Sequence, residues 1–113
     1  MGMNIDSYSF GRFVIDGKVY EHDIKIINGR IVFWQNHHLS IEDIKDAINA
    51  KPKPSTIIIG TGASGVVEVS QDIIDEIKKA NIKLIIEMTG KACQTYNKLS
   101  KKENVAAILH STC

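Results

Sequence analysis

The clearest chemical potential in this sequence lies in a glycine-rich loop, residues 60–65, which follows a short run of apolar β-branched residues. Its three glycines would let several backbone N–H groups turn toward one anion, and Thr61 and Ser64 add hydroxyl groups. The spacing does not match a nucleotide-binding fingerprint. No Lys-Ser/Thr pair follows the last glycine, and residues 66–69 separate the loop from the next helix. A structural tight turn is therefore the favoured interpretation, with an anion site as the alternative.

A second polar loop, residues 87–90, follows another apolar run. Thr89 directly precedes an expected helix, so its expected role is that of an N-cap, with an anion site at the helix N-terminus as the alternative. Glu87 is the one acidic side chain to test as a general base. No Ser-His-Asp order, carboxylate pair or metal-binding helix motif accompanies it, so no catalytic residue is assigned.

The elements around these loops are expected to place them at one edge of a sheet. Residues 56–59 and 82–86 have the pattern of buried strands, and parallel pairing brings their carboxyl ends, where open α/β sheets bind ligands, together. A helix over residues 41–50 would run antiparallel to the strand it precedes, which brings the preceding histidines to the same edge. The candidate ligand-binding residues are therefore Thr61, Gly62, Ser64, Gly65, His37, Glu87 and Thr89.

Histidine and cysteine side chains supply the donors that zinc prefers, at His37, His38, His110 and Cys113. Adjacent histidines rarely direct both rings to one metal, and no closely spaced Cys or His pair accompanies them, so neither a metal nor a cofactor is predicted. The place of His110 depends on the direction of the last strand, which the residue pattern does not fix. Cys93 is expected to be a buried structural thiol, with a reactive thiol near a helix N-terminus as the alternative.

The first third of the chain has the period-two pattern of β-strands. Asp16-Gly17 and Asn28-Gly29 favour tight hairpin turns. Closing the second hairpin pairs Ile26 with Ile31 and Ile24 with Phe33, and closing the first pairs Phe13 with Tyr20 and Val14 with Val19.

The rest of the chain alternates helices with strands. Ser40 precedes the helix 41–50 as its cap, Ser70 can cap a second helix with Ile73 and Ile77 on its apolar face, and a third covers roughly 91–101. Residues 105–109 form the final strand. The predicted fold is a single α/β domain over residues 1–113, in three layers: a mixed central sheet, helices packed on it and an N-terminal antiparallel hairpin layer.

Composition supports one packed domain. The 113 residues are 43% hydrophobic and 24% charged, with a net charge of +1, which is ordinary for a globular protein and gives no reason to expect a nucleic-acid partner. Apolar runs are too short to cross a membrane, and two cysteines without a signal-like start predict a cytoplasmic protein.

Several short segments resemble a domain-of-unknown-function family, which includes the adipogenesis-associated protein and a mitochondrial complex I alpha-subcomplex assembly factor. The segments are Phe10-Gly11 before the Asp16-Gly17 hairpin, His37-His38-Leu39-Ser40, Ile59-Gly60-Thr61-Gly62, Ala92-Cys93 with Tyr96-Asn97, and the ending Ala106-Ala107, Leu109-His110 and Thr112-Cys113. The resemblance implies a three-layer domain with a mixed sheet whose last strand is antiparallel to the others. It also implies a role in binding or assembly rather than catalysis, although the chain lacks the Arg-rich presequence of the mitochondrial branch.

The leading hypothesis is a non-catalytic binding or assembly module, whose unidentified protein partner contacts the edge formed by the loop 60–65 and His37. Exposed Trp34 and Tyr8 would serve as anchors, while for Trp34 the alternative is a hairpin residue that closes the core. The second hypothesis is a small-molecule or anion-binding protein, with enzymes included, whose crevice contains Thr61, Ser64, Glu87 and Thr89. The sequence does not specify an oligomeric state.

Overall fold

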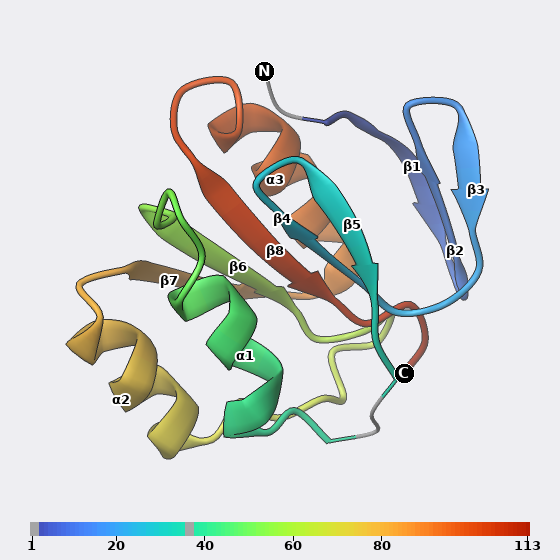
Figure 1. The fold of residues 1–113 in the computed structure, drawn as a ribbon. Coiled ribbons are helices and arrows are strands. Elements are labelled where there is room, and N and C mark those ends of the chain that lie inside the picture. The colour runs from blue at the N-terminus through green and yellow to red at the C-terminus, as the bar shows by residue number, and fades with distance from the viewer. Residues whose placement is uncertain (1–2, 36–37) are drawn as a thin grey trace.

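The chain forms two β-sheets and three helices in a computed structural model that describes residues 3–35 and 38–113. A three-stranded antiparallel sheet contains β1 (Ile5–Ser9), β2 (Arg12–Ile15) and β3 (Lys18–Tyr20). A five-stranded sheet contains β4 (Ile24–Ile27), β5 (Arg30–Phe33), β6 (Thr56–Gly60), β7 (Lys83–Glu87) and β8 (Val105–Leu109). The helices are α1 (Ile41–Ile48), α2 (Gln71–Lys79) and α3 (Thr89–Leu99) (Figure 1). The predicted α/β domain with a mixed sheet and an antiparallel N-terminal layer is confirmed.

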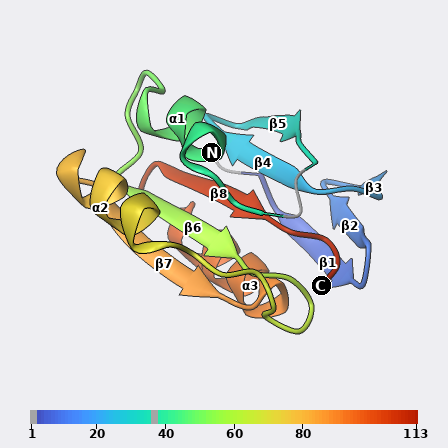
Figure 2. The same cartoon turned by 90° about the horizontal axis from the view of Figure 1, so that it is seen from below.

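The five-stranded sheet has the order β5-β4-β8-β6-β7. Strand β6 pairs in parallel with both β7 and β8, while β4 is antiparallel to β8 and β5. The last strand was expected to be antiparallel to the others. Strand β8 is antiparallel to β4, but it is parallel to β6, so the expectation is wrong for the pairing with β6. The crossover through α3 returns the chain to the end of the sheet at which β7 began, so β8 runs in the same direction as β6 and β7 (Figure 2).

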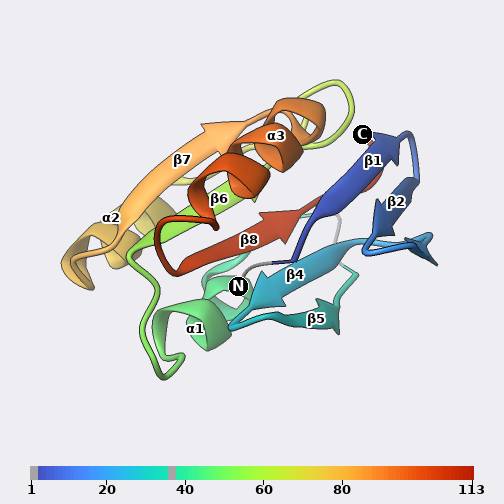
Figure 3. The ribbon, with the colours of Figure 1, turned by 90° about the horizontal axis from the view of Figure 1, so that it is seen from above.

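Helices α1 and α2 cover one face of this sheet, and α3 with the three-stranded sheet covers the other (Figure 3). Side chains on β6 alternate between the two cores: Ile57 and Ile59 pack on the α1 and α2 side, and Ile58 packs on the α3 side. All three are completely buried, and each such side chain contributes about 1.5–3 kcal/mol through removal of apolar surface from water. The apolar run 56–59 is thus a central strand, as its composition predicts.

Both predicted hairpin registers are confirmed. Phe13 pairs with Tyr20, and Ile24 pairs with Phe33. The turn residues Asp16, Gly17, Asn28 and Gly29 all have positive φ, as tight hairpin turns with a right-handed twist require. Strand β1 adds a third strand beside β2 that the hairpin signals alone did not indicate.

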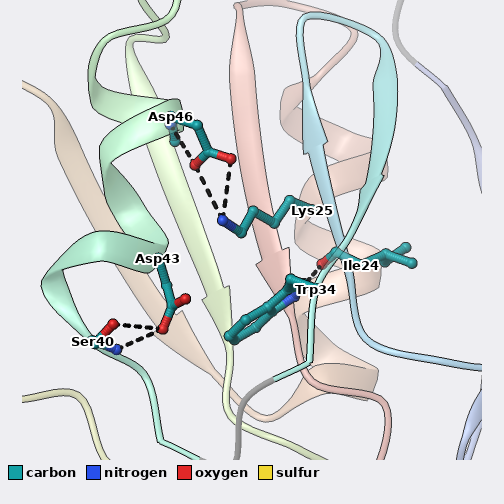
Figure 4. A network of polar contacts seen from close by, with 7 residues as sticks. Ile24, Lys25, Trp34, Ser40, Asp43 and Asp46 are labelled. Carbon is teal, nitrogen blue, oxygen red and sulfur yellow. Dashed lines mark hydrogen bonds and ion pairs between the residues drawn. The ribbon is translucent and has the colours of Figure 1, made fainter.

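The N-terminal ends of two of the three helices have the serine caps that the sequence predicts. The Ser40 backbone N–H and hydroxyl donate to Asp43 Oδ2 at 2.8 and 2.9 Å, which fixes the start of α1 (Figure 4). The Ser70 hydroxyl accepts from the Ile73 N–H at 3.3 Å. Helix α3 instead begins at Thr89, with Met88 as its cap residue, so the prediction of Thr89 as the N-cap is wrong.

Trp34 closes the core of the α1 and α2 side, as the alternative interpretation predicted. Its side chain is buried, and its Nε1–H donates to the Ile24 carbonyl at 3.1 Å (Figure 4). The expectation of an exposed Trp34 anchor is wrong, because the chain after β5 turns so that the Trp34 side chain lies over the sheet. In the described part of the chain, no helix is long and apolar enough to span a membrane.

Candidate functional site

The loop after β6 donates its backbone N–H groups to other parts of the chain. Strands β6 and β7 end in register, with Gly60 beside Glu87, and the Thr61 N–H donates to the Glu87 carbonyl at 2.9 Å. Four further N–H donations secure the loop: Gly62 to Thr89 Oγ1 at 2.8 Å, Ala63 to the Thr112 carbonyl at 3.3 Å, Ser64 to the Cys113 carbonyl at 2.9 Å and Gly65 to the Gly62 carbonyl at 3.3 Å. The five N–H groups of residues 61–65 are thus occupied within the chain, which supports a structural role for the loop.

Thr89 connects this loop to the segment that follows β8. Its side chain is completely buried, accepts from the Gly62 N–H, and donates from Oγ1 to the His110 carbonyl at 2.8 Å. The Thr89 N–H also donates to the Gly62 carbonyl at 3.0 Å. A hydroxyl engaged in this way cannot cap α3, which is the physical reason that the capping prediction fails.

Two positions of the loop require glycine, because other parts of the chain approach their Cα atoms closely. A Cβ atom on Gly60 would lie 2.9 Å from both Leu109 Cδ2 and Thr89 Oγ1. A Cβ on Gly62 would contact the Thr112 carbonyl oxygen and lie 2.7 Å from the Cys113 carbonyl carbon, and its φ of +104° is itself unfavourable for other residues. The glycines let the loop pack against the chain's own C-terminal segment.

The remaining predicted site residues are only partly brought together. The Thr61 hydroxyl is buried and donates to the Glu87 carbonyl at 3.2 Å, whereas Ser64 is exposed. The Glu87 carboxylate is half-buried and accepts from the Thr95 hydroxyl at 2.6 Å, so it is engaged with α3. His37 lies outside the described residues.

His110 is a residue of this edge that the sequence pattern left open. Because β8 runs parallel to β6, His110 follows β8 at the same end, where its N–H donates to the Gly60 carbonyl at 3.1 Å and its ring Nδ1 lies 3.3 Å from that oxygen. The ring packs edge-on against Trp34, with 4.7 Å between centroids. The missing signal was the direction of the last strand, which depends on tertiary pairing.

Two other ionisable groups, the Cys93 thiol and the Tyr8 hydroxyl, are held in their protonated forms. Cys93 is buried, and burial raises the pKa of its thiol to about 12, so the expectation of a buried structural cysteine is confirmed. Burial, followed by the nearby Cys93, Asp23 and Cys113, raises the pKa of Tyr8 to about 12. Tyr8 is half-buried, and its hydroxyl donates to the Ser111 carbonyl at 2.8 Å.

Within the described ranges, no group of three His, Cys, Asp or Glu side chains is arranged to hold a metal ion.

Exposed apolar side chains lie beside the loop and strand β7. The exposed fractions are 66% for Val66, 43% for Ile86 and 52% for Met88. Ile86 and Met88 lie two residues apart, and a Cβ on Gly65, next to Val66, would lie 2.9 Å from Met88 Cγ. We call these three residues the β7 apolar patch.

Comparison with known proteins identifies relatives over almost the whole chain. The family model described as a protein of unknown function (DUF498/DUF598) matches residues 5–110. The chain is 28% identical over 109 residues to the NADH dehydrogenase [ubiquinone] 1 alpha subcomplex assembly factor 3 of Danio rerio, and the match covers 94% of this chain and 62% of that relative's length. It is 31% identical over 107 residues to the 13 kDa major membrane protein of Francisella tularensis, with coverage of 90% and 85% respectively.

Solved structures share the fold. A conserved hypothetical protein of Pyrococcus horikoshii superposes with a TM-score of 0.87 at 26% identity, covering 98% of this chain and all of that one. A protein of Bartonella henselae, described as an outer membrane protein, gives a TM-score of 0.84 at 23% identity, with coverage of 98% and 96%.

Proposed function

Because the chain belongs to the family of proteins of unknown function DUF498/DUF598, we propose that it is a non-catalytic binding or assembly module whose protein partner docks on the β7 apolar patch. The observation that carries this proposal is the exposure of Val66, Ile86 and Met88 beside the loop 60–65. Exposed apolar side chains gathered at one place are typical of surfaces that bind another protein.

The position of the patch at a sheet edge adds to this argument. Among the strands that the structure describes, β7 pairs only with β6, so its outer edge carries backbone groups that a partner polypeptide can meet. The occupant we propose is a protein with an apolar surface of its own. The Danio rerio relative is named as an assembly factor, which supports a protein partner for this chain. A cytoplasmic location is part of the proposal.

The second hypothesis, an anion or small-molecule crevice at the loop, has less support from the geometry. The N–H groups of Gly62 and Ser64, which an anion would need, donate to Thr89 Oγ1 and to the Cys113 carbonyl. The Glu87 carboxylate accepts a hydrogen bond from Thr95. Binding an anion there requires the loop to give up bonds that hold its own shape.

Site-specific crosslinking tests the proposal. A photoreactive residue at position 88 is expected to capture one protein reproducibly from native cells, whereas the same residue at the exposed Val19 on β3 does not. The captured protein is then purified and titrated with the unmodified chain and with Met88→Glu, which we expect to weaken binding about tenfold or more. Val19→Glu is the matched control and should bind like the unmodified chain.

Two outcomes would overturn the docking surface. One is equal capture from positions 88 and 19. The other is an identified partner whose affinity is unchanged by Met88→Glu while Val19→Glu weakens it. Thermal unfolding of both variants shows whether each remains folded, because both replace exposed side chains.

A further inference from the structure

The connections at the amino-terminal ends of β6, β7 and β8, together with the β4–β5 turn, carry an excess of positive charge. Residues 28–30, 49–55, 80–83 and 100–104 include six lysine or arginine residues and one acidic residue, whereas the whole chain has 14 and 13. All six cationic side chains are exposed. We call them the basic end, and they are Arg30, Lys51, Lys53, Lys83, Lys101 and Lys102.

Hydrogen bonds hold these four connections together. Asn104 Nδ2 donates to Asn28 Oδ1 at 3.2 Å and to the Pro52 carbonyl at 3.3 Å. The Ser55 N–H donates to the Asn104 carbonyl at 2.9 Å, and the Lys83 N–H donates to the Ser55 carbonyl at 3.0 Å. In Figure 1 this end of the sheet lies toward the upper left, away from the C-terminus. Charges from four distant parts of the sequence thus belong to one surface.

Most of this charge is not used to stabilise the described part of the chain. Lys51, Lys101 and Lys102 make no ion pair with another described residue. The one carboxylate in these connections, Glu103, accepts from the Ser55 hydroxyl at 2.6 Å. A lysine in the last turn of a helix complements the helix dipole, but none of the six residues lies in a helix. The charge of the basic end is therefore left for an anion outside the chain.

The surroundings of the basic end favour an extended anionic surface as that partner. The three clefts described on this chain have no lysine or arginine in their linings, so none of them encloses a small anion with these side chains. The exposed large apolar side chains of the described residues all lie in other segments. A protein interface normally has an apolar centre, and the basic end has none.

Nucleic acid fits this surface less well, for two reasons. The exposed aromatic side chains of the described residues, Phe10 and Phe33, lie outside these connections, so no base can stack there. Each helix leads into one of the connections 49–55, 80–83 and 100–104, so the helix N-termini, which bind phosphate groups, lie at the opposite end of the sheet.

We propose that the basic end binds the anionic headgroup surface of a lipid bilayer, without inserting into it. A cluster of about four to eight lysines or arginines is drawn to acidic lipids when the side chains come within a Debye length, about 10 Å, of the surface. Strand β7 begins at Lys83, and the β7 apolar patch lies at its other end. Bilayer binding therefore leaves that patch open to a protein partner, and it does not depend on the proposed function.

Sedimentation of the full chain with lipid vesicles tests this proposal. We expect binding to phosphatidylcholine vesicles that contain about 30% phosphatidylglycerol, and no binding to phosphatidylcholine alone. The bound fraction should fall as NaCl rises from about 50 to 300 mM, because salt screens the attraction. The double variant Lys101→Gln with Lys102→Gln should weaken binding about tenfold or more.

The matched control removes two exposed positive charges from the opposite end of the sheet, by Arg12→Gln with Lys91→Gln. Arg12 follows Gly11, whose N–H donates to the Ser111 carbonyl, and Lys91 lies in the first turn of α3. This variant should weaken binding by about twofold or less, because its charges lie far from the bilayer. Circular dichroism checks that both variants are folded, as expected when exposed side chains are replaced.

Nanodiscs that contain a gadolinium-chelating lipid test the orientation of the bound chain. The amide NMR resonances of residues 51, 53, 101 and 102 should broaden, whereas those of residues 62–65 should not. The proposal is overturned by an absence of binding to the anionic vesicles at low salt, by equal binding to neutral vesicles, by equal weakening in the two double variants, or by broadening at residues 62–65 instead. Tighter binding to duplex DNA, to RNA or to polyglutamate than to the anionic vesicles would identify another class of partner and would also overturn it.

Discussion

The Thr89 hydroxyl donates a 2.8 Å hydrogen bond to the carbonyl oxygen of His110, and this bond joins the first residue of α3 to the segment after β8. The same hydroxyl accepts from the Gly62 N–H, so both its donor and its acceptor function are used inside the protein. One buried side chain therefore holds together the three chain segments that leave the same end of the sheet.

Replacing Thr89 by valine should destabilise the fold. The shape of the side chain is kept, but the Gly62 N–H and the His110 carbonyl both lose a buried partner. The free energy of unfolding is expected to fall by about 1–3 kcal/mol, measured by urea unfolding followed by circular dichroism. Thr89→Ser keeps the hydroxyl and should lose less. An equal loss in both variants would contradict the role of the hydrogen bonds.

Gly62→Ala should destabilise the fold more than Gly29→Ala. Both glycines have positive φ, +104° and +73°, so each alanine meets unfavourable backbone geometry, which costs about 1–2 kcal/mol. Only at Gly62 does the new Cβ also contact the C-terminal segment, because nothing lies within 4 Å of a Cβ on Gly29. Urea unfolding of both variants measures the difference. Equal destabilisation would mean that the contact with Thr112 is relieved without cost.

The parts of the fold that local chemistry dictates were predictable from the sequence. Asp16-Gly17 and Asn28-Gly29 set the hairpin registers, because a two-residue turn leaves only one way to pair the strands beside it. The run 56–59 identified the central strand, because β-branched residues without polar neighbours must be covered on both faces.

The parts that depend on tertiary pairing were not predictable. The direction of β8 is set by its place between β4 and β6, and the residues 105–109 have the same pattern in either direction. The position of His110 and the buried hydroxyl of Thr89 follow from that placement. The burial of Trp34 was not predictable either, because period-two patterning does not reveal that the chain turns after β5 and places this side chain over the sheet.

The ion pair between Lys25 and Asp46 joins β4 to α1, and its two partners should respond differently to substitution. The Lys25 Nζ lies 3.1 Å from Asp46 Oδ2, and the side chain of Lys25 is 8% exposed whereas that of Asp46 is 45% exposed (Figure 4). Asp46→Ala leaves a buried ammonium without its hydrogen-bond partner, and we expect a loss of about 1–3 kcal/mol. Lys25→Met fills the same volume and leaves Asp46 near solvent, so it should cost less. Urea unfolding of the two variants measures both values, and a larger loss in Lys25→Met would contradict this account.

Alkaline pH should destabilise the protein partly through Cys93. The folded state raises the pKa of this thiol from 9.0 to about 12, so above pH 9 the folded chain binds more protons than the unfolded chain. The free energy of unfolding must then fall as pH rises from about 9 toward 12, by up to about 1.4 kcal/mol per pH unit from this group. Urea unfolding at several pH values measures the slope. Cys93→Ala removes the buried thiol and should flatten the slope by that amount. Identical slopes for Cys93→Ala and the unmodified chain would place the alkaline sensitivity in other groups, such as Tyr8.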